Sequence, residues 1–196
     1  MPIWSEKALL RKRILSLRRS LSYEETGRKS DKVKERLFGL SVFYEARVIL
    51  FYLSLPDEVQ TQQMIKVALK LNKIVGVPLV KLKERDILPV ELKSFNEGLT
   101  VGPLGIPQPE EGRYQPLSLN KIDLVIIPGI VFDARGNRIG FGMGFYDRFL
   151  KRISSRARAV ALAFELQLVS TIPSQLHDIQ VDYIITEKRV IKCKRI

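Results

Sequence analysis

Apolar side chains recur at three- and four-residue spacing through the first part of the chain, which predicts two amphipathic helices. The first is expected over residues 6–21, and its apolar side consists of Leu9, Leu10, Ile14, Leu17 and Leu21. The second is expected after Ser22, because serine favours the N-cap and two glutamates follow where the helix dipole stabilises acids. Ile3 and Trp4 are expected to pack in the core, as large apolar side chains usually do.

Farther along the chain, short continuous apolar runs alternate with amphipathic segments. Such runs, rich in β-branched and aromatic residues, are typical of strands that are covered on both faces. Strands are expected at 48–53, 74–80, 87–92, 123–128, 158–164 and 182–186. Helical segments are expected after Thr61, which can cap the first of them, and at 142–154 and 166–172. This alternation predicts an α/β fold, a three-layer α/β/α domain with a mostly parallel sheet, preceded by the N-terminal helices.

One segment interrupts the alternation. Residues 98–116 contain four prolines and four glycines, so we expect an irregular surface loop there. A chain of 196 residues can bury one core without dividing, and we expect residues 1–196 to form a single domain. Ligands of parallel sheets bind beyond the carboxyl ends of the strands, so the loops after Leu55, Pro128 and Phe164 are the places to look for chemistry.

Charge and residue usage narrow the classes of function. The net charge of +12, from 33 Lys and Arg against 21 Asp and Glu, attracts anions, whether nucleic acid or a small polyanionic substrate. A single cysteine, Cys193, and a single histidine, His177, exclude an internal disulfide, a cysteine-based zinc cluster and a multi-histidine metal site. The charged N-terminus is unlike a signal peptide and no apolar run could span a bilayer, so we expect a cytoplasmic protein without a membrane partner.

The strongest candidate for chemistry is the segment 137–149, NRIGFGMGFYDRF. Gly140, Gly142 and Gly144 alternate there before an expected helix, and successive glycines let backbone N–H groups approach an anion such as phosphate. The spacing matches neither a Walker A loop nor the dinucleotide-binding GxGxxG pattern. A tight glycine turn without a ligand is the structural alternative.

Charged neighbours strengthen the interpretation as a phosphate site. Arg138 and Arg148 flank the glycines and can bind phosphate, and Asp147 can hold Mg²⁺ against nucleotide oxygens. The alternative for Asp147 is an ion pair with Arg148 or Lys151 on the helix surface.

The chain resembles the 5-formyltetrahydrofolate cyclo-ligase family, also called 5,10-methenyltetrahydrofolate synthetases. The family signature is written as PG, then FD, then GxRxGxGxGYYD, and here DLVIIPGIVFDARGN precedes RIGFGMGFYDRFL. Four further segments match in order: K-x-x-x-R at 7–11, LSLPDEVQT at 53–61, IPQP at 106–109 and the C-terminal segment 161–186. Five ordered segments are far more specific than one glycine loop.

The resemblance implies roles for individual residues. ATP would be bound by Lys7, Arg11, Arg138, Gly140, Gly142, Gly144 and Tyr146. The folate would be bound by Leu53, Glu58, Phe141, Met143 and Phe145. Asp147 and Asp178 would hold magnesium, and Arg138 and Tyr146 would act in catalysis. The last three folate residues depart from the family pattern, which often has a basic residue or tyrosine, then glycine or lysine, then tyrosine at these positions.

The implied reaction is the ATP- and Mg²⁺-dependent conversion of 5-formyltetrahydrofolate to 5,10-methenyltetrahydrofolate. ADP and phosphate are released, and the formyl oxygen is phosphorylated on the way. We therefore expect a monomer that binds reduced folate and ATP, and we do not expect nucleic acid as a partner. His177, in a polar loop, is left out of the catalytic set. A nucleic-acid-binding protein and another enzyme, such as a sugar-phosphate isomerase or CoA transferase, stay open as alternatives.

Overall fold

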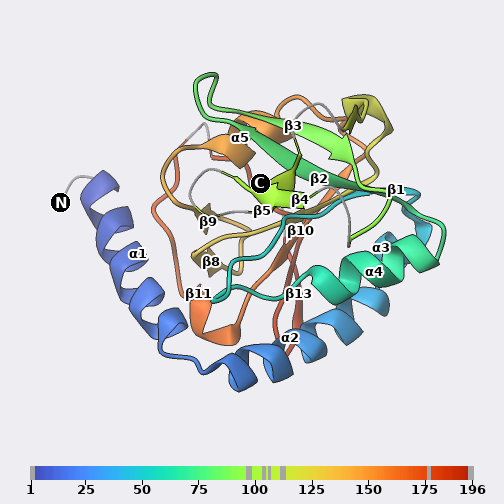
Figure 1. Cartoon of the computed structure of the whole chain (residues 1–196). Coiled ribbons are helices and arrows are strands. Elements are labelled where there is room, and N and C mark those ends of the chain that lie inside the picture. Colours follow the sequence, from blue (N-terminus) through green and yellow to red (C-terminus); the bar gives the residue numbers. More distant parts are fainter. Residues whose placement is uncertain are drawn as a thin grey trace.

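A mostly parallel sheet forms the centre of the molecule. The computed structural model describes residues 3–95, 99–102, 105, 107–110, 114–175 and 178–193. Within them, the large sheet contains β1 (Val48–Leu50), β2 (Ile74–Lys81), β3 (Asp86–Glu91), β6 (Gln115–Pro116), β7 (Leu124–Ile127), β10 (Arg158–Leu162), β12 (Tyr183–Ile185) and β13 (Val190–Lys192). Their order is β13-β12-β10-β7-β1-β2-β3-β6 (Figure 1). The strands from β12 to β2 run parallel and the edge strands β13, β3 and β6 pair antiparallel, which confirms the predicted sheet.

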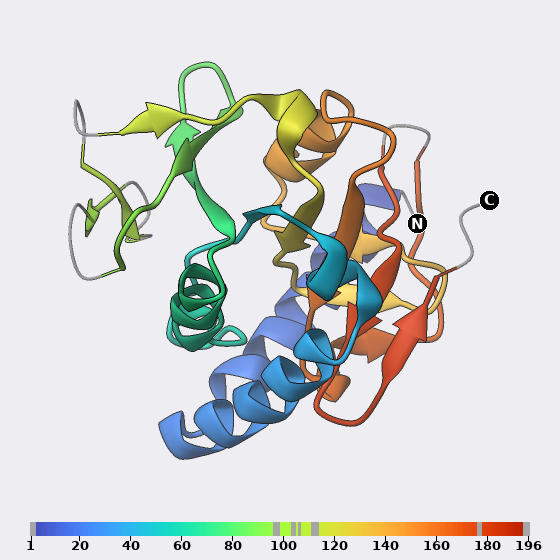
Figure 2. The same ribbon diagram turned by 90° about the vertical axis from the view of Figure 1, so that its right-hand side faces the viewer.

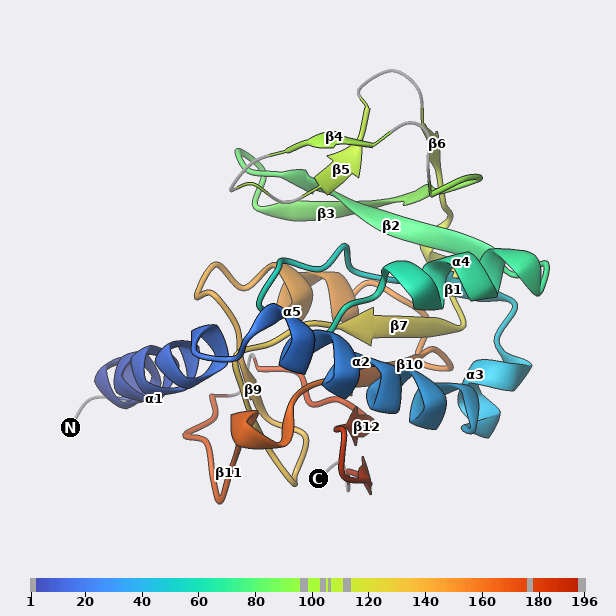
Figure 3. The same ribbon diagram turned by 60° about the horizontal axis from the view of Figure 1, so that its bottom comes forward.

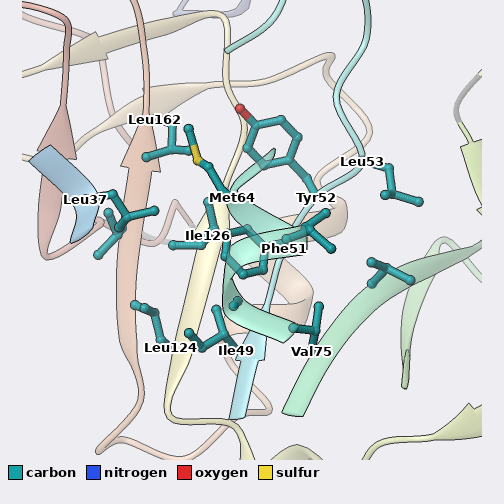
Figure 4. Close-up of a cluster of buried hydrophobic side chains, with 14 of the residues drawn as sticks. Leu37, Ile49, Phe51, Tyr52, Leu53, Met64, Val75, Leu124, Ile126 and Leu162 are labelled. Carbon is teal, nitrogen blue, oxygen red and sulfur yellow. The ribbon is translucent and has the colours of Figure 1, made fainter. Parts of the chain in front are cut away.

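Helices cover both faces of this sheet. The described α-helices are α1 (Ile3–Arg19), α2 (Tyr23–Phe38), α3 (Ser41–Glu45), α4 (Gln62–Lys70) and α5 (Phe145–Leu150). Alternate residues of each strand point to opposite faces. Ile49 and Ile126 belong to the buried cluster of α2, α3 and α4 (Figure 4). Leu50 and Val125 belong to the cluster on the other face, with Phe149 of α5, and the three-layer prediction is confirmed.

A smaller sheet supports α1 and the glycine loop, which we define as residues 140–144. It consists of β11 (Leu168–Val169), β8 (Val131–Asp133) and β9 (Arg138–Ile139), in that order. Ile14 of α1 and Ile139 share one buried cluster. The fully buried carboxylate of Asp133 accepts a hydrogen bond of 3.1 Å from the backbone N–H of Asn137, which fixes the turn between β8 and β9. The start of the glycine loop is thereby held in place.

The segment predicted as an irregular loop contains strands. β4 (Leu99–Val101) pairs antiparallel with β5 (Pro107–Pro109), and β6 extends the edge of the large sheet. Figures 2 and 3 show the β4–β5 pair beside the long β2–β3 hairpin and away from the C-terminal strands. The prediction for 98–116 is wrong in these parts, because β4 and β5 pair with each other, β6 pairs with β3 of the hairpin, and proline is tolerated in edge strands.

Local predictions near the helix ends had mixed outcomes. Ser22 caps α2 as predicted, since its Oγ accepts a hydrogen bond of 3.1 Å from the N–H of Glu25. Thr61 makes no cap bond; its hydroxyl instead donates to the carbonyl oxygen of Tyr52 at 2.7 Å. Trp4 and Ile3 are exposed by 74% and 40%, so their prediction as core residues is wrong.

The helix predicted at 166–172 is replaced by a short 3₁₀ turn and a strand. The turn η3 (Glu165–Gln167) is followed directly by β11. Gln167 accepts a hydrogen bond from the N–H of Phe164 at 2.7 Å and donates to the carbonyl of Gly129 at 2.8 Å. These bonds hold the 3₁₀ turn against the segment that follows β7. A further 3₁₀ turn, η2, spans Leu119–Lys121. No helix over the described ranges has the length and apolarity of a membrane span.

Candidate functional site

A cavity of about 670 Å³ opens where α1, the glycine loop and the β2–β3 hairpin meet. Its volume suits a small-molecule site. The segments after β1 and β7 line it, at the carboxyl ends of those strands as predicted. The third expected loop, after Phe164, contributes no described lining residue until Gln175. All the site residues named from the sequence line the cavity: Lys7, Arg11, Leu53, Glu58, Arg138, Gly140, Phe141, Gly142, Met143, Gly144, Phe145, Tyr146, Asp147 and Asp178.

The inward face of α1 carries basic side chains as well as apolar ones. Lys7, Arg11, Ile14 and Arg18 follow one another at helical spacing, and Ile14 and Arg18 are 3% and 1% exposed. Leu9 and Leu17, by contrast, are 56% and 45% exposed, so the predicted apolar stripe is wrong for these two residues. This face turns inward because hydrogen-bond acceptors for its basic side chains lie beneath it. The guanidinium Nε of Arg11, for example, donates to the carbonyl of Gly140 at 2.8 Å.

The glycine loop requires glycine at two of its positions. Gly142 and Gly144 have φ angles of +98° and +65°, in the left-handed region where a side chain is strained. A Cβ at residue 144 would also lie 2.9 Å from Nη1 of Arg148. That guanidinium donates to the carbonyls of Met143 and Arg85, each at 2.8 Å, and so connects the loop to the tip of the β2–β3 hairpin.

Two ion pairs bring the predicted metal ligands to one end of the cavity. Nζ of Lys7 lies 2.5 Å from Oδ2 of Asp178, and Nη2 of Arg138 lies 3.0 Å from Oδ1 of Asp147. The N–H of Ile179 also donates to Asp147, at 3.1 Å. Asp147 therefore contacts the residue that directly follows Asp178. The alternative pairing of Asp147 with Arg148 is thus not formed. We call this part of the cavity the α1 side. It consists of Lys7, Arg11, the glycine loop, Asp147 and Asp178.

The two aspartates form a donor set suited to magnesium. Mg²⁺ prefers oxygen ligands and is commonly held by one or two carboxylates together with substrate phosphates. Both described hydrogen bonds of Asp147 end on Oδ1, so Oδ2 accepts neither of them. Within the described part of the chain, no group of three or more His, Cys, Asp or Glu side chains could hold a metal alone. A magnesium ion here would therefore need the ligand's own oxygens.

The opposite end, the β1 side, consists of Tyr52, Leu53, Glu58 and Tyr146. Glu58 is 5% exposed, and its Oε2 accepts a hydrogen bond of 3.0 Å from the N–H of Leu55. Burial raises the pKa of the Glu58 carboxyl, although Arg18, 3.6 Å away, acts to lower it. Arg18 is closer to Asp57, at 2.9 Å, and the negative charge of Asp57 also acts to raise the pKa of Glu58.

Two phenols share this side of the cavity, the buried Tyr52 and the partly buried Tyr146. Burial, followed by the negative charge of Glu58, raises the pKa of Tyr146, while Arg138 acts in the other direction. The pKa of Tyr52 is also raised by burial, and its hydroxyl donates to the carbonyl of Val59 at 2.8 Å. Both phenols therefore stay protonated near neutral pH, so Tyr146 can donate a hydrogen bond but is a poor base.

Sequence reasoning missed Arg18. This residue belongs to α1, but its guanidinium contacts Asp57 and Glu58 on the β1 side. The available signal was its position eleven residues after Lys7, on the same face of α1. His177, by contrast, lies outside the described residues.

The model of the 5-formyltetrahydrofolate cyclo-ligase family matches residues 3–187. The chain belongs to this family. It is 35% identical to the mouse 5-formyltetrahydrofolate cyclo-ligase over 191 residues, which cover 93% of this chain and 94% of that protein. The NMR structure of 5,10-methenyltetrahydrofolate synthetase from Aquifex aeolicus is similar, with a TM-score of 0.83, 34% identity and coverage of 96% and 93% of the two chains. The family resemblance is confirmed, and the chain is a ligase.

A more distant structure agrees in fold. The 5,10-methenyltetrahydrofolate synthetase from Mycoplasma pneumoniae has a TM-score of 0.75 at 22% identity, covering 92% of this chain and 98% of that one. A probable cyclo-ligase from Caenorhabditis elegans is 30% identical over 194 residues, with 94% of each chain covered. The fold is thus shared with a structure whose sequence identity to this chain, 22%, is well below the 35% of the mouse protein.

Proposed function

We propose that the protein uses MgATP to convert 5-formyltetrahydrofolate into 5,10-methenyltetrahydrofolate, releasing ADP and phosphate. The observation that carries the proposal is that a single cavity is lined by every site residue named from the sequence, both the charged residues of the α1 side and the buried Glu58 of the β1 side. These ends suit the two halves of the chemistry, a polyanionic nucleotide and a flat reduced folate.

The formyl oxygen must be turned into a leaving group. Attack of this oxygen on the terminal phosphorus of ATP forms an O–P bond and breaks the bond to ADP. The formyl carbon is then electrophilic, and the neighbouring folate nitrogen forms the new C–N bond and loses its proton to solvent. The C–O bond breaks as phosphate leaves. Such a reaction needs positioning and charge stabilisation more than a protein nucleophile.

The ion pairs of the α1 side are suited to a ligand that carries both signs of charge. A magnesium nucleotide could exchange partners with them: Lys7 and Arg138 would turn to phosphate oxygens, and Asp178 and Asp147 to the metal. Bound magnesium would supply neutralisation of phosphate charge. Arg11 and the N–H groups of the glycine loop would complete the phosphate contacts.

On the β1 side, Glu58 would accept hydrogen bonds from the N–H edge of the pterin, and Leu53 would contact its face. Arg18 would hold the Glu58 carboxylate in place. Tyr146, protonated at neutral pH, would donate a hydrogen bond toward the reacting oxygen. Arg138, whose guanidinium lies 6.0 Å from the Tyr146 ring centre, would stabilise the charge that develops on the transferred phosphoryl group.

The test is a spectrophotometric assay for the methenyl product, with ADP release measured in the same samples. We expect product only when 5-formyltetrahydrofolate, ATP and Mg²⁺ are all present, with ADP formed in equal amount. ATP turnover without folate, or methenyl product without ATP, would overturn the proposal. Absence of both activities would favour the binding-protein alternative.

A further inference from the structure

We infer that Trp4 is the stacking surface for the base of the bound nucleotide. Trp4 lies in the first turn of α1, lines the cavity and is 74% exposed. Tyr23 and Tyr44 are more exposed still, at 90% and 82%, but neither of them lines the cavity. The inference deepens the proposed function and rests on it for the identity of the ligand, a nucleoside triphosphate.

The position of Trp4 along α1 suits a base whose phosphates bind farther down the helix. Trp4, Lys7 and Arg11 are three and then four residues apart, so they share one helix face, and all three line the cavity. At a rise of about 1.5 Å per residue, Trp4 and Arg11 are separated by roughly 10 Å along the axis. The ribose and the first phosphates span a comparable length between the base and the terminal phosphate. The same face continues to Arg18, which contacts Glu58 on the β1 side, so the terminal phosphate would point toward the folate.

A second apolar surface faces the cavity from the glycine loop. Phe141 is 51% exposed and lines the cavity, and the bond from Arg11 to the carbonyl of Gly140 joins α1 to the loop one residue away. An aromatic side chain thus comes from each of the two elements that carry the phosphate-binding residues. Aromatic faces attract nucleotide bases because every base has a π-surface to stack.

The chain provides its own probe for this contact, because Trp4 is its single tryptophan. The intact protein is titrated with MgATP and, separately, with magnesium tripolyphosphate, which has phosphates but no base. Calorimetry measures binding, and tryptophan fluorescence reports contact with the base. We expect both ligands to bind and only MgATP to change the fluorescence.

Variants separate stacking from phosphate binding. Trp4→Ala should weaken MgATP binding by about 5- to 150-fold, the range for one stacked base, and leave tripolyphosphate binding unchanged. Trp4→Phe should recover most of the ATP affinity. Leu9→Ala is the matched control, because Leu9 is 56% exposed on the same helix but does not line the cavity. It should bind both ligands as the wild type does.

Several outcomes would overturn the inference. These are calorimetric binding of MgATP without a fluorescence change, unaltered ATP affinity in Trp4→Ala, or a fluorescence response to 5-formyltetrahydrofolate alone. The methenyl assay, run on the same preparations, keeps the two proposals apart. Turnover by the wild type with no role for Trp4 defeats only the inference, whereas MgATP-dependent fluorescence without turnover supports the inference and defeats the proposed reaction.

Discussion

The two ends of the cavity treat charge in opposite ways. On the α1 side, charges are balanced in one-to-one pairs that are partly buried: the side chains of Lys7 and Asp178 are 15% and 16% exposed. On the β1 side, Glu58 is buried, its pKa is raised, and its nearest cation is shared with Asp57. A paired charge can exchange its partner for a ligand group of the same sign without being left unpaired, whereas the Glu58 carboxyl is held by the N–H of Leu55 and by Arg18. Substitutions on the α1 side should therefore alter rates and nucleotide affinity, and those on the β1 side folate affinity and pH-dependent stability.

The largest effect is expected from Asp147→Asn. If its carboxylate holds magnesium, turnover should fall by about 100-fold or more and the magnesium requirement should rise, while folate binding is retained. The amide oxygen can still accept the hydrogen bond from Ile179, so the loop should keep its structure. A magnesium titration of turnover with a parallel thermal melt makes the measurement.

The control for this variant is Asp31→Asn, which removes an equal charge from an exposed pair on α2. It should leave the rate unchanged. A wild-type magnesium profile in Asp147→Asn would show that the metal role belongs to another residue.

Next in size are Lys7→Ala and Arg11→Ala. Each removes a charge-assisted contact, for which about 1.5 to 3 kcal/mol is typical, so ATP affinity should fall by roughly 10- to 150-fold. The melting temperature should change little, because Ile14 still anchors the helix. Nucleotide affinity is measured by calorimetry, with Lys12→Ala, exposed on the same helix and outside the cavity, as the control. Unchanged affinity in both variants would remove α1 from the nucleotide site.

On the β1 side, Glu58→Gln should weaken folate binding by about 10-fold, because a neutral amide accepts hydrogen bonds from the pterin less strongly. ATP affinity should stay at the wild-type value, which reverses the pattern of the α1-side variants. Calorimetry with each ligand separates the two sides. Glu45→Gln, exposed at the end of α3, is the control. Normal folate affinity in Glu58→Gln would leave Glu58 without a role in binding.

The smallest effect is a pH trend in stability. Because the pKa of Glu58 is raised on folding, the folded state binds its proton more tightly than the unfolded chain does. The free energy of unfolding should then decrease as the pH rises from the ordinary glutamate value of 4.5 to the raised value. Glu58→Gln cannot lose that proton, so its melting temperature relative to the wild type should increase with pH over this window. Thermal melts across the window measure the trend, and a constant difference would contradict it.

Much of the fold could be predicted because it depends on local patterns. The apolar runs at 48–53 and 123–128 predicted buried strands, since only a strand covered on both faces is apolar at consecutive positions. Ser22 predicted its helix start from a bond made within three residues. The β4–β5 pair escaped prediction because its stability comes from a partner strand rather than from its own sequence of prolines and glycines.

The sequence by itself determined the fold class, the family and many of the residues that line the cavity. It could do so because apolar periodicity and motif spacing are local properties. Only the tertiary structure decided which face of α1 turns inward and which charges pair. Lys7 meets Asp178 from 171 positions away, and Arg18 becomes buried because Asp57 and the carbonyl of Gly129 lie beneath it. Helical periodicity names the faces of a helix, but the acceptors that choose between them come from distant segments and exist only after the chain has folded.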